Sequence, residues 1–128
     1  MNNPRHIRYL IILLTCHYFA GCRTTPQISY QRDVRPIFVD KCTGCHTPPY
    51  GEGYRQTGLN LESYKSLMIG SIYGPVVVPG NSKMSPLNML AEGRAGDLLR
   101  EMENRHTPMT DHEMGVLRLW VEQGAQDN

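Results

Sequence analysis

The chain has 128 residues, with 13 lysines and arginines against 12 aspartates and glutamates and a formal net charge of +1 at pH 7. This length allows one domain at most. The charge is nearly balanced and no basic block is present, so the composition does not favour a nucleic-acid-binding surface. A domain of this size has a thin hydrophobic core and gains stability from a staple or a cofactor.

The start of the chain has the pattern of an export signal. A short basic segment with Arg5 and Arg8 precedes an apolar run from residue 9 to residue 20. That run is too short to span a bilayer, which takes roughly 20 residues. The letters FAGC follow, and small residues before Cys22 resemble a bacterial lipobox. We expect residues 1–21 to be a lipoprotein signal peptide and Cys22 to be acylated, with an ordinary secretory signal or an uncleaved anchor as the alternatives.

The next segment leads into the first predicted helix. Residues 22–31 are polar and contain Pro26, so we interpret them as a tether to the lipid. The folded domain is expected over residues 32–126. Asp33 is the predicted N-cap of its first helix, and proline is tolerated in the first turn. Apolar side chains then recur at helical spacing and run into the letters CTGCH; they are Val34, Ile37, Phe38 and Cys42.

The middle of the chain is predicted to contain loops and two short helices. Residues 47–58 are rich in proline and glycine and are expected to be loop. Residues 59–70 predict an extended pair of leucines followed by a short helix. Residues 71–83 carry turn signals around one apolar run and are expected to be loop. Ser85 is the predicted N-cap of the next helix, which Gly93 ends.

The last helix has the clearest signals. The letters TDHE form a capping box, with Thr110 as the N-cap and Glu113 at the third helical position. An apolar stripe follows with Trp120 beside it, and Gly124 ends the helix. Another short helix is possible over residues 97–105.

The letters CTGCH, residues 42–46, carry the chemistry. Two intervening residues let both thiols add to the two vinyl groups on one side of a haem, and His46 then lies under the iron as an axial ligand. A zinc site takes about four ligands, often as two CxxC pairs, and the sequence has no second pair. A thioredoxin-like dithiol begins a helix within a βαβ pattern, whereas this motif ends one. We therefore expect one haem c, held covalently through Cys42 and Cys45.

Four stretches around this motif resemble a class I c-type cytochrome, and in particular the planctomycete-type single-haem domains. They are DVRPIFVDKCTGCH, GLNLESYKSL, VVPGNSKMSPL and PMTDHEMGVLRLWVEQGA, and they cover most of residues 31–125. The resemblance implies a small all-α fold in which the N- and C-terminal helices pack around one covalent haem, with long loops between them. Phe38 and Trp120 would then be helix-contact residues or neighbours of the haem.

The resemblance also raises the question of which residue faces His46 across the iron. The family places a methionine several residues before the final helix, whereas this chain reads ENRHTPMTDHE. Met109 directly precedes Thr110, where it could instead pack on Met114. His106 lies four residues before the cap, where the shortest family loops carry their methionine. We favour His106 as the distal ligand and keep Met109 as the alternative; another methionine or an open sixth position are further options.

The function that the resemblance implies is electron transport. A single haem with both axial positions filled would cycle between Fe(III) and Fe(II) and carry electrons between exported redox proteins, without a substrate site. The lipid anchor at Cys22 would hold the protein, expected to be a monomer, near partners on the periplasmic side of a bacterial membrane. Two other functions stay open: a small haem c enzyme or a gas or peroxide sensor with a labile sixth ligand, and an accessory domain that haem staples together.

Overall fold

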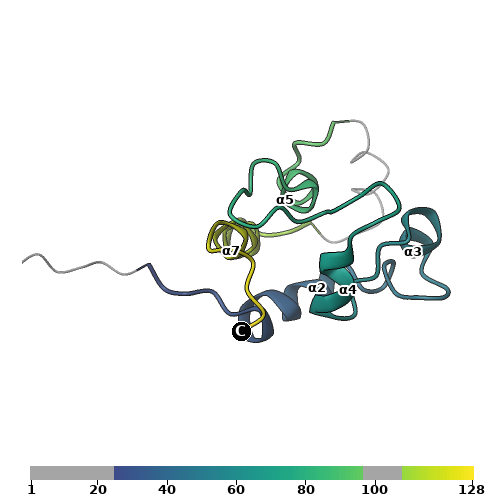
Figure 1. Ribbon diagram of the computed structural model, residues 1–128, viewed down its shortest axis with the longest axis horizontal. Coiled ribbons are helices and arrows are strands. Elements are labelled where there is room, and N and C mark those ends of the chain that lie inside the picture. Colours follow the sequence, from purple (N-terminus) through teal and green to yellow (C-terminus); the bar gives the residue numbers. More distant parts are fainter. Residues whose placement is uncertain (1–24, 97–107) are drawn as a thin grey trace, which may run out of the picture.

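The computed structural model of the chain describes residues 25–96 and 108–128 (Figure 1). Its helices there are η2 (Tyr30–Val34), α2 (Arg35–Lys41), α3 (Glu52–Thr57), α4 (Tyr64–Ile69), α5 (Pro86–Ala91) and α7 (Asp111–Glu122). These ranges contain no β-strand, only an isolated bridge between Ser71 and Gly74, and the prediction of an all-α fold is confirmed. No helix in them is both long and apolar enough to cross a bilayer.

Several predictions from the sequence fall on other parts of the chain. The signal peptide at 1–21, the lipidation site Cys22, the possible helix at 97–105 and the candidate ligand His106 all lie outside the described residues.

The first helical segment begins earlier than predicted. The Ser29 hydroxyl accepts a hydrogen bond from the backbone N–H of Arg32, and the Asp33 carboxylate accepts one from the backbone N–H of Ser29 at 2.8 Å. Ser29 is therefore the N-cap of a single π-helical turn, η2, which continues into α2 with Pro36 near its start. The prediction of Asp33 as the N-cap was wrong, because Ser29, four residues earlier, supplies the cap and Asp33 returns its hydrogen bond.

Helix α3 lies in a segment for which the sequence predicts only loop, and that prediction was wrong. The prolines at 48 and 49 precede the helix and do not interrupt it. Its end is closed by Gly58, which has a left-handed φ of 68° and donates its N–H to the carbonyl of Tyr54 at 2.6 Å. Such a glycine C-cap is a common way to end a helix. The glycines at 51 and 53 have the pattern of turn signals, but they allow a close contact with the CTGCH turn.

The remaining elements follow the sequence closely. Leu59 and Leu61 are buried and precede α4, and residues 71–83 form the predicted loop. Ser85 stands at the N-cap of α5 as predicted, although its hydroxyl is used elsewhere. It accepts a hydrogen bond from the Val78 N–H at 2.8 Å and donates one to the Asn81 carbonyl at 2.9 Å. Ser85 thereby fastens the loop to the helix that follows it.

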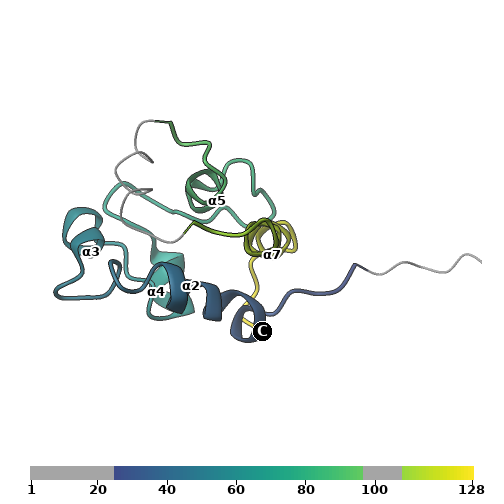
Figure 2. The ribbon, with the colours of Figure 1, turned by 180° about the vertical axis from the view of Figure 1, so that it is seen from behind.

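The capping box of α7 is confirmed. The Thr110 hydroxyl accepts from the Glu113 N–H at 3.2 Å, and the Glu113 carboxylate accepts from the Thr110 N–H at 2.7 Å. The helix ends at Glu122, and Gly124 follows with a φ of 97°. In Figure 1, α5 and α7 lie above α2 and α4, while α3 lies at the end of the long axis away from α7, and the view from behind in Figure 2 shows the same arrangement.

A cluster of aromatic rings joins the first and last helical segments. The ring centroid of Tyr30 lies 5.5 Å from that of Trp120, 5.2 Å from that of Tyr64 and 6.4 Å from that of Phe38. Phe38 and Trp120 are 0% and 1% exposed, so both are helix-contact residues of the core. Because α2 belongs to this cluster, the residues at its end are attached to a rigid support.

Tyr30 offers a test of this core. Its hydroxyl is buried and has no hydrogen-bond partner among the described residues, and burial is the main cause that raises its pKa. Tyr30→Phe should therefore raise the free energy of unfolding by about 1 kcal/mol, because it removes an unsatisfied polar group. Tyr64→Phe is the matched control: the Tyr64 hydroxyl donates to the Ala125 carbonyl at 2.9 Å, so about 1 kcal/mol should be lost. Urea denaturation measures both, and equal shifts in the same direction would contradict the assignment.

Candidate haem site

The letters CTGCH form a turn that continues α2. The Cys42 N–H donates to the Phe38 carbonyl at 2.9 Å, and the N–H groups of Cys45 and His46 both donate to the Cys42 carbonyl, at 3.1 and 3.0 Å. The two cysteines are free thiols, and they project with His46 from this one turn. Such an arrangement would let both thiols add to the vinyl groups of one haem and let His46 bind its iron. A dithiol of the thioredoxin kind would begin a helix instead.

Helix α3 packs closely against this turn through two glycines. A Cβ at Gly51 would overlap the carbonyl oxygen of Cys45, and a Cβ at Gly53 would lie 2.6 Å from Cε1 and 2.8 Å from Nε2 of His46. The Tyr54 N–H also donates to the Cys45 carbonyl at 2.9 Å. The backbone of α3 therefore packs directly against the imidazole ring of His46, and this contact is called the seat of the imidazole. Sequence reasoning missed both glycines, although their G-x-G spacing shortly after CTGCH was a signal that could have pointed to them.

The Cys42 thiol is partly enclosed by the hydrophobic core, against which it packs. Burial is the main cause that raises its pKa to about 11, and the nearby Asp40 carboxylate adds to the effect. The thiol is consequently neutral at physiological pH. A neutral, apolar sulfur at this place is compatible with a thioether, which carries no charge either.

The raised pKa predicts how the haem-free chain responds to alkaline pH. The folded state holds the Cys42 proton more tightly than the unfolded state, so stability is lost as the pH rises from about 9 to about 11. The loss is about 3 kcal/mol at most, because each pKa unit corresponds to about 1.4 kcal/mol. Urea midpoints at several pH values measure it, and Cys42→Ala should remove this part of the pH dependence. Identical pH profiles of the two proteins would contradict the prediction.

The candidate distal ligands are placed differently. Met109 directly precedes the N-cap Thr110, and its side chain is partly buried and packs against the hydrophobic core. His106 lies outside the described residues. Met84 is 65% exposed, and Met68 packs against the core. Of the residues that the sequence singles out for the haem, the structure thus brings the two cysteines and His46 together.

These residues fit a covalently bound haem. Two thiols and one imidazole project from a single turn, the Cys42 side chain packs against the hydrophobic core, and the His46 ring lies against the backbone of Gly53. An all-α fold with CTGCH at the end of an early helix, and a capped final helix packed on that helical segment, defines the class of c-type cytochromes.

The comparison with protein families agrees with this class. Residues 42–102 match the family model described as Planctomycete cytochrome C. The chain therefore contains a planctomycete-type cytochrome c domain, which is a haem-binding domain. The matched residues begin at Cys42 and extend beyond α5, whereas α2 and α7 lie outside them. No curated protein and no solved structure matches the chain.

Proposed function

We propose that the protein is a membrane-tethered cytochrome with one haem c that carries electrons between exported redox proteins. The observation that carries this proposal is the CTGCH turn, with its two free thiols and an imidazole seated on α3. Cys42 and Cys45 would hold the haem, and His46 would be the proximal ligand. When bound, the haem supplies reversible one-electron chemistry between Fe(III) and Fe(II).

The chain's own contribution would be to hold this site still. The Cys42 N–H bonds to Phe38, which is 0% exposed, and the Leu61 N–H donates to the His46 carbonyl at 2.9 Å. The turn is therefore fixed from both sides, by the core and by the segment before α4. A ligand held by packing and by supporting hydrogen bonds keeps its geometry better than one on a free loop.

We propose His106 as the distal ligand, with Met109 as the alternative. Support comes from Met109 itself, whose side chain already packs against the core and would have to leave it to reach a metal. A second imidazole gives a lower reduction potential than a thioether.

The two assignments are separated by a pair of substitutions. His106→Ala should open the sixth position of the iron, so that the purified protein binds carbon monoxide rapidly. Met109→Leu should leave it closed, because His106 would still bind the iron and leucine, of similar volume, would keep the packing at residue 109. Absorption spectra before and after addition of the gas measure both, and the oxidised wild type should lack the far-red sulfur-to-iron band. The reverse pattern would make Met109 the distal ligand. Rapid binding of carbon monoxide by the wild-type protein would instead favour a sensor or an enzyme.

The anchoring at Cys22 and the export to the periplasmic side are part of the same proposal. Their support is the lipobox-like sequence before Cys22. Voltammetry of the lipidated holoprotein tests the function: a reversible one-electron couple is expected, and its absence would refute the electron carrier. The mass of the N-terminal peptide tests the anchor separately.

A further inference from the structure

We propose that the two ends of the folded chain form a clamp that holds the domain close to the membrane and directs the CTGCH turn away from it. The clamp consists of residues 26–31 and residues 123–128. This inference rests on the lipid anchor at Cys22, which belongs to the proposed function.

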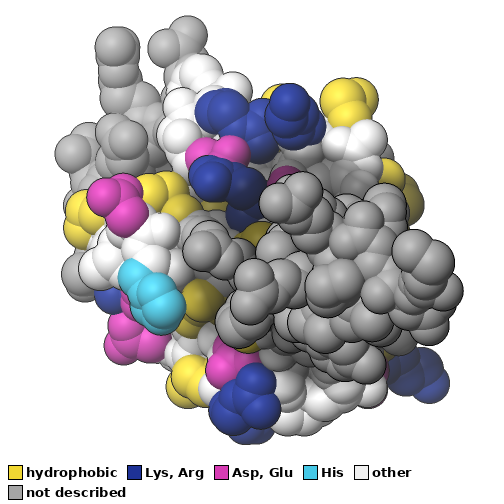
Figure 3. Space-filling model, turned by 90° about the vertical axis from the view of Figure 1, so that its left-hand side faces the viewer, with side chains coloured by type: hydrophobic (Ala, Val, Ile, Leu, Met, Phe, Trp, Pro, Cys, Tyr) yellow, Lys and Arg dark blue, Asp and Glu magenta, His cyan; other side chains and the backbone are white. Residues whose placement is uncertain are grey.

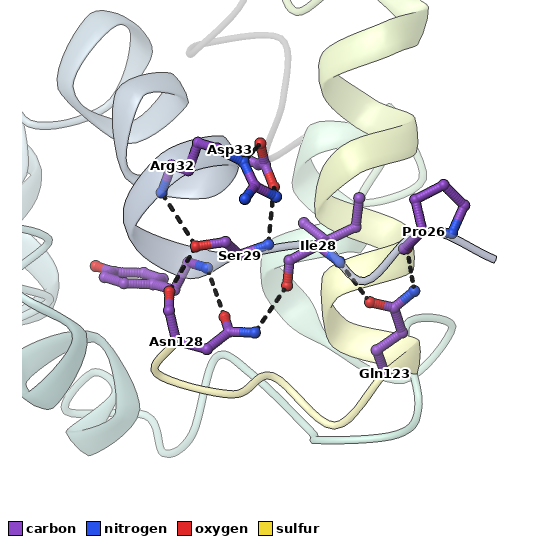
Figure 4. Close-up of polar contacts among 8 residues, drawn as sticks. Pro26, Ile28, Ser29, Arg32, Asp33, Gln123 and Asn128 are labelled. Atoms are coloured by element: carbon purple, nitrogen blue, oxygen red, sulfur yellow. Dashed lines mark hydrogen bonds and ion pairs between the residues drawn. The ribbon is translucent and has the colours of Figure 1, made fainter. Parts of the chain in front are cut away.

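The side chains of Gln123 and Asn128 make the centre of the clamp (Figure 4). Gln123 accepts a hydrogen bond from the Ile28 N–H at 2.8 Å and donates one to the Pro26 carbonyl at 3.0 Å. Asn128 accepts from the Tyr30 N–H at 2.9 Å and donates to the Ile28 carbonyl at 3.3 Å. Each amide thus binds the N-terminal segment with both its oxygen and its nitrogen.

Further bonds extend the clamp to the end of the chain. The Ser29 hydroxyl donates to the Asn128 carbonyl oxygen at 2.6 Å, the Gln31 N–H donates to the same oxygen at 3.2 Å, and the Gln31 amide donates to the Asp127 carboxylate at 3.0 Å. Behind them, Ala125 is 0% exposed. The C-terminal segment is itself anchored in the core, so the clamp ties the N-terminal segment to the body of the domain.

The clamp shortens the free chain between lipid and domain. If residues 22–31 were a free tether, nine Cα–Cα steps of about 3.5 Å would allow a reach of about 32 Å. Because Pro26 is already bonded to Gln123, only four steps remain from Cys22, which gives about 14 Å. This is less than half the reach of a free tether, and it leaves the domain little room to tumble.

The clamp also sets which end of the molecule faces the lipid. Figures 1 and 2 place α7 and the C-terminus toward the end where the described chain begins, and α3 toward the opposite end of the long axis. Helix α2 leads from η2 to CTGCH and is about 10 Å long at 1.5 Å per residue. An anchor beside the clamp therefore turns α3 and CTGCH toward the aqueous phase, where a redox partner can reach them.

The end of the molecule in Figure 3 presents a mixed surface wherever its side chains are described. Its described side chains include cations and acids together, with hydrophobic ones scattered among them. The exposed ion pair of Arg32 with Asp33, at 2.8 Å, belongs to the same helical turn as the clamp. A surface of mixed sign neither enters the apolar layer nor is drawn strongly to one lipid charge, so the tether and the clamp decide the orientation.

Nitroxide labels at the two ends of the lipidated holoprotein test this inference. Arg32→Cys places a label near the clamp and Gln56→Cys places one on α3; both positions are exposed, and haem attachment would occupy Cys42 and Cys45. The protein is bound to phosphatidylcholine vesicles with and without a nickel-chelating lipid. The nickel-induced relaxation should be larger at residue 32 than at residue 56.

A second comparison tests the clamp itself. In the Gln123→Ala/Asn128→Ala protein the difference between the two label positions should shrink. Gln126→Ala is the matched control, because among the described residues the Gln126 amide hydrogen-bonds to the Gly124 carbonyl alone, at 3.5 Å, and it should leave the difference unchanged. Equal relaxation at both positions in the lipidated wild type would overturn the orientation while leaving the electron-transfer proposal intact. A mass spectrum without lipid on Cys22 would instead refute the anchor, and the inference with it.

Discussion

The Gly53→Ala protein should fail to hold a normally ligated haem. A Cβ at this position would lie 2.6 to 3.0 Å from three atoms of the His46 ring, which is closer than nonbonded atoms approach. Either the imidazole or α3 must move, and overpacking of this kind costs about 1–3 kcal/mol. The haem content per protein and the absorption spectrum measure the loss. Alanine stabilises a helix by about 1 kcal/mol relative to glycine, so the substitution does not weaken α3 itself. A loss of haem would therefore arise from the contact with His46.

Gly44→Ala is the matched control within the motif itself. A Cβ at Gly44 would meet nothing within 4 Å, so the protein should carry haem as the wild type does. Gly115→Ala on α7 also has open space and should be tolerated. If Gly53→Ala kept a normal spectrum, α3 would not be the seat of the proximal ligand. If Gly44→Ala lost its haem as well, haem attachment would be sensitive to substitutions that meet no neighbour. The contact between Gly53 and His46 would then not explain the loss in Gly53→Ala.

Trp120→Ala should cause the largest loss of stability, about 3–5 kcal/mol in the free energy of unfolding. Trp120 is 1% exposed, its ring packs near those of Tyr30 and Tyr64, and its Nε1–H donates to the Gln126 carbonyl at 2.9 Å. The substitution removes a large buried ring and releases the C-terminal segment. Denaturation by urea, followed by far-ultraviolet circular dichroism, measures the effect.

Leu119→Ala is the control for this prediction. Leu119 precedes Trp120 in the same helix but is 36% exposed, so its replacement should cost less than about 1 kcal/mol. Similar losses for both variants would mean that α7 is held by its own helical propensity and not by the aromatic cluster.

The sequence predicted best the features that depend on near neighbours. The capping box of Thr110 and Glu113 joins residues three positions apart and is confirmed. The five consecutive residues of CTGCH indicate haem, which the family match supports, while the attachment through Cys42 and Cys45 stays a prediction. The start of the first helix was placed too late, because a serine and an aspartate four residues apart can both act as caps. The structure shows that Ser29 is the N-cap and that Asp33 hydrogen-bonds back to it.

The sequence could not predict the features that depend on how separate segments of the chain meet in space. Gly53 resembles a loop glycine, and only its contact with His46 explains it. The hydrogen bond from the Ile28 N–H to the Gln123 side chain joins residues 95 positions apart. No pattern of neighbouring residues in the sequence could therefore predict that the N-terminal segment is bound to the C-terminal one. The helical state of α3 was missed for a local reason, since the prolines and glycines around it outweighed six residues with modest preference for a helix.

The most direct test of the account is extraction of the purified protein with acidified organic solvent, followed by mass spectrometry of the peptide that carries Cys42 and Cys45. The protein should be produced in a host that attaches haem to a known c-type cytochrome. We predict that the haem stays with the chain and that this peptide is heavier by one haem. A peptide with two unmodified thiols, from cells that load the control cytochrome, would contradict it.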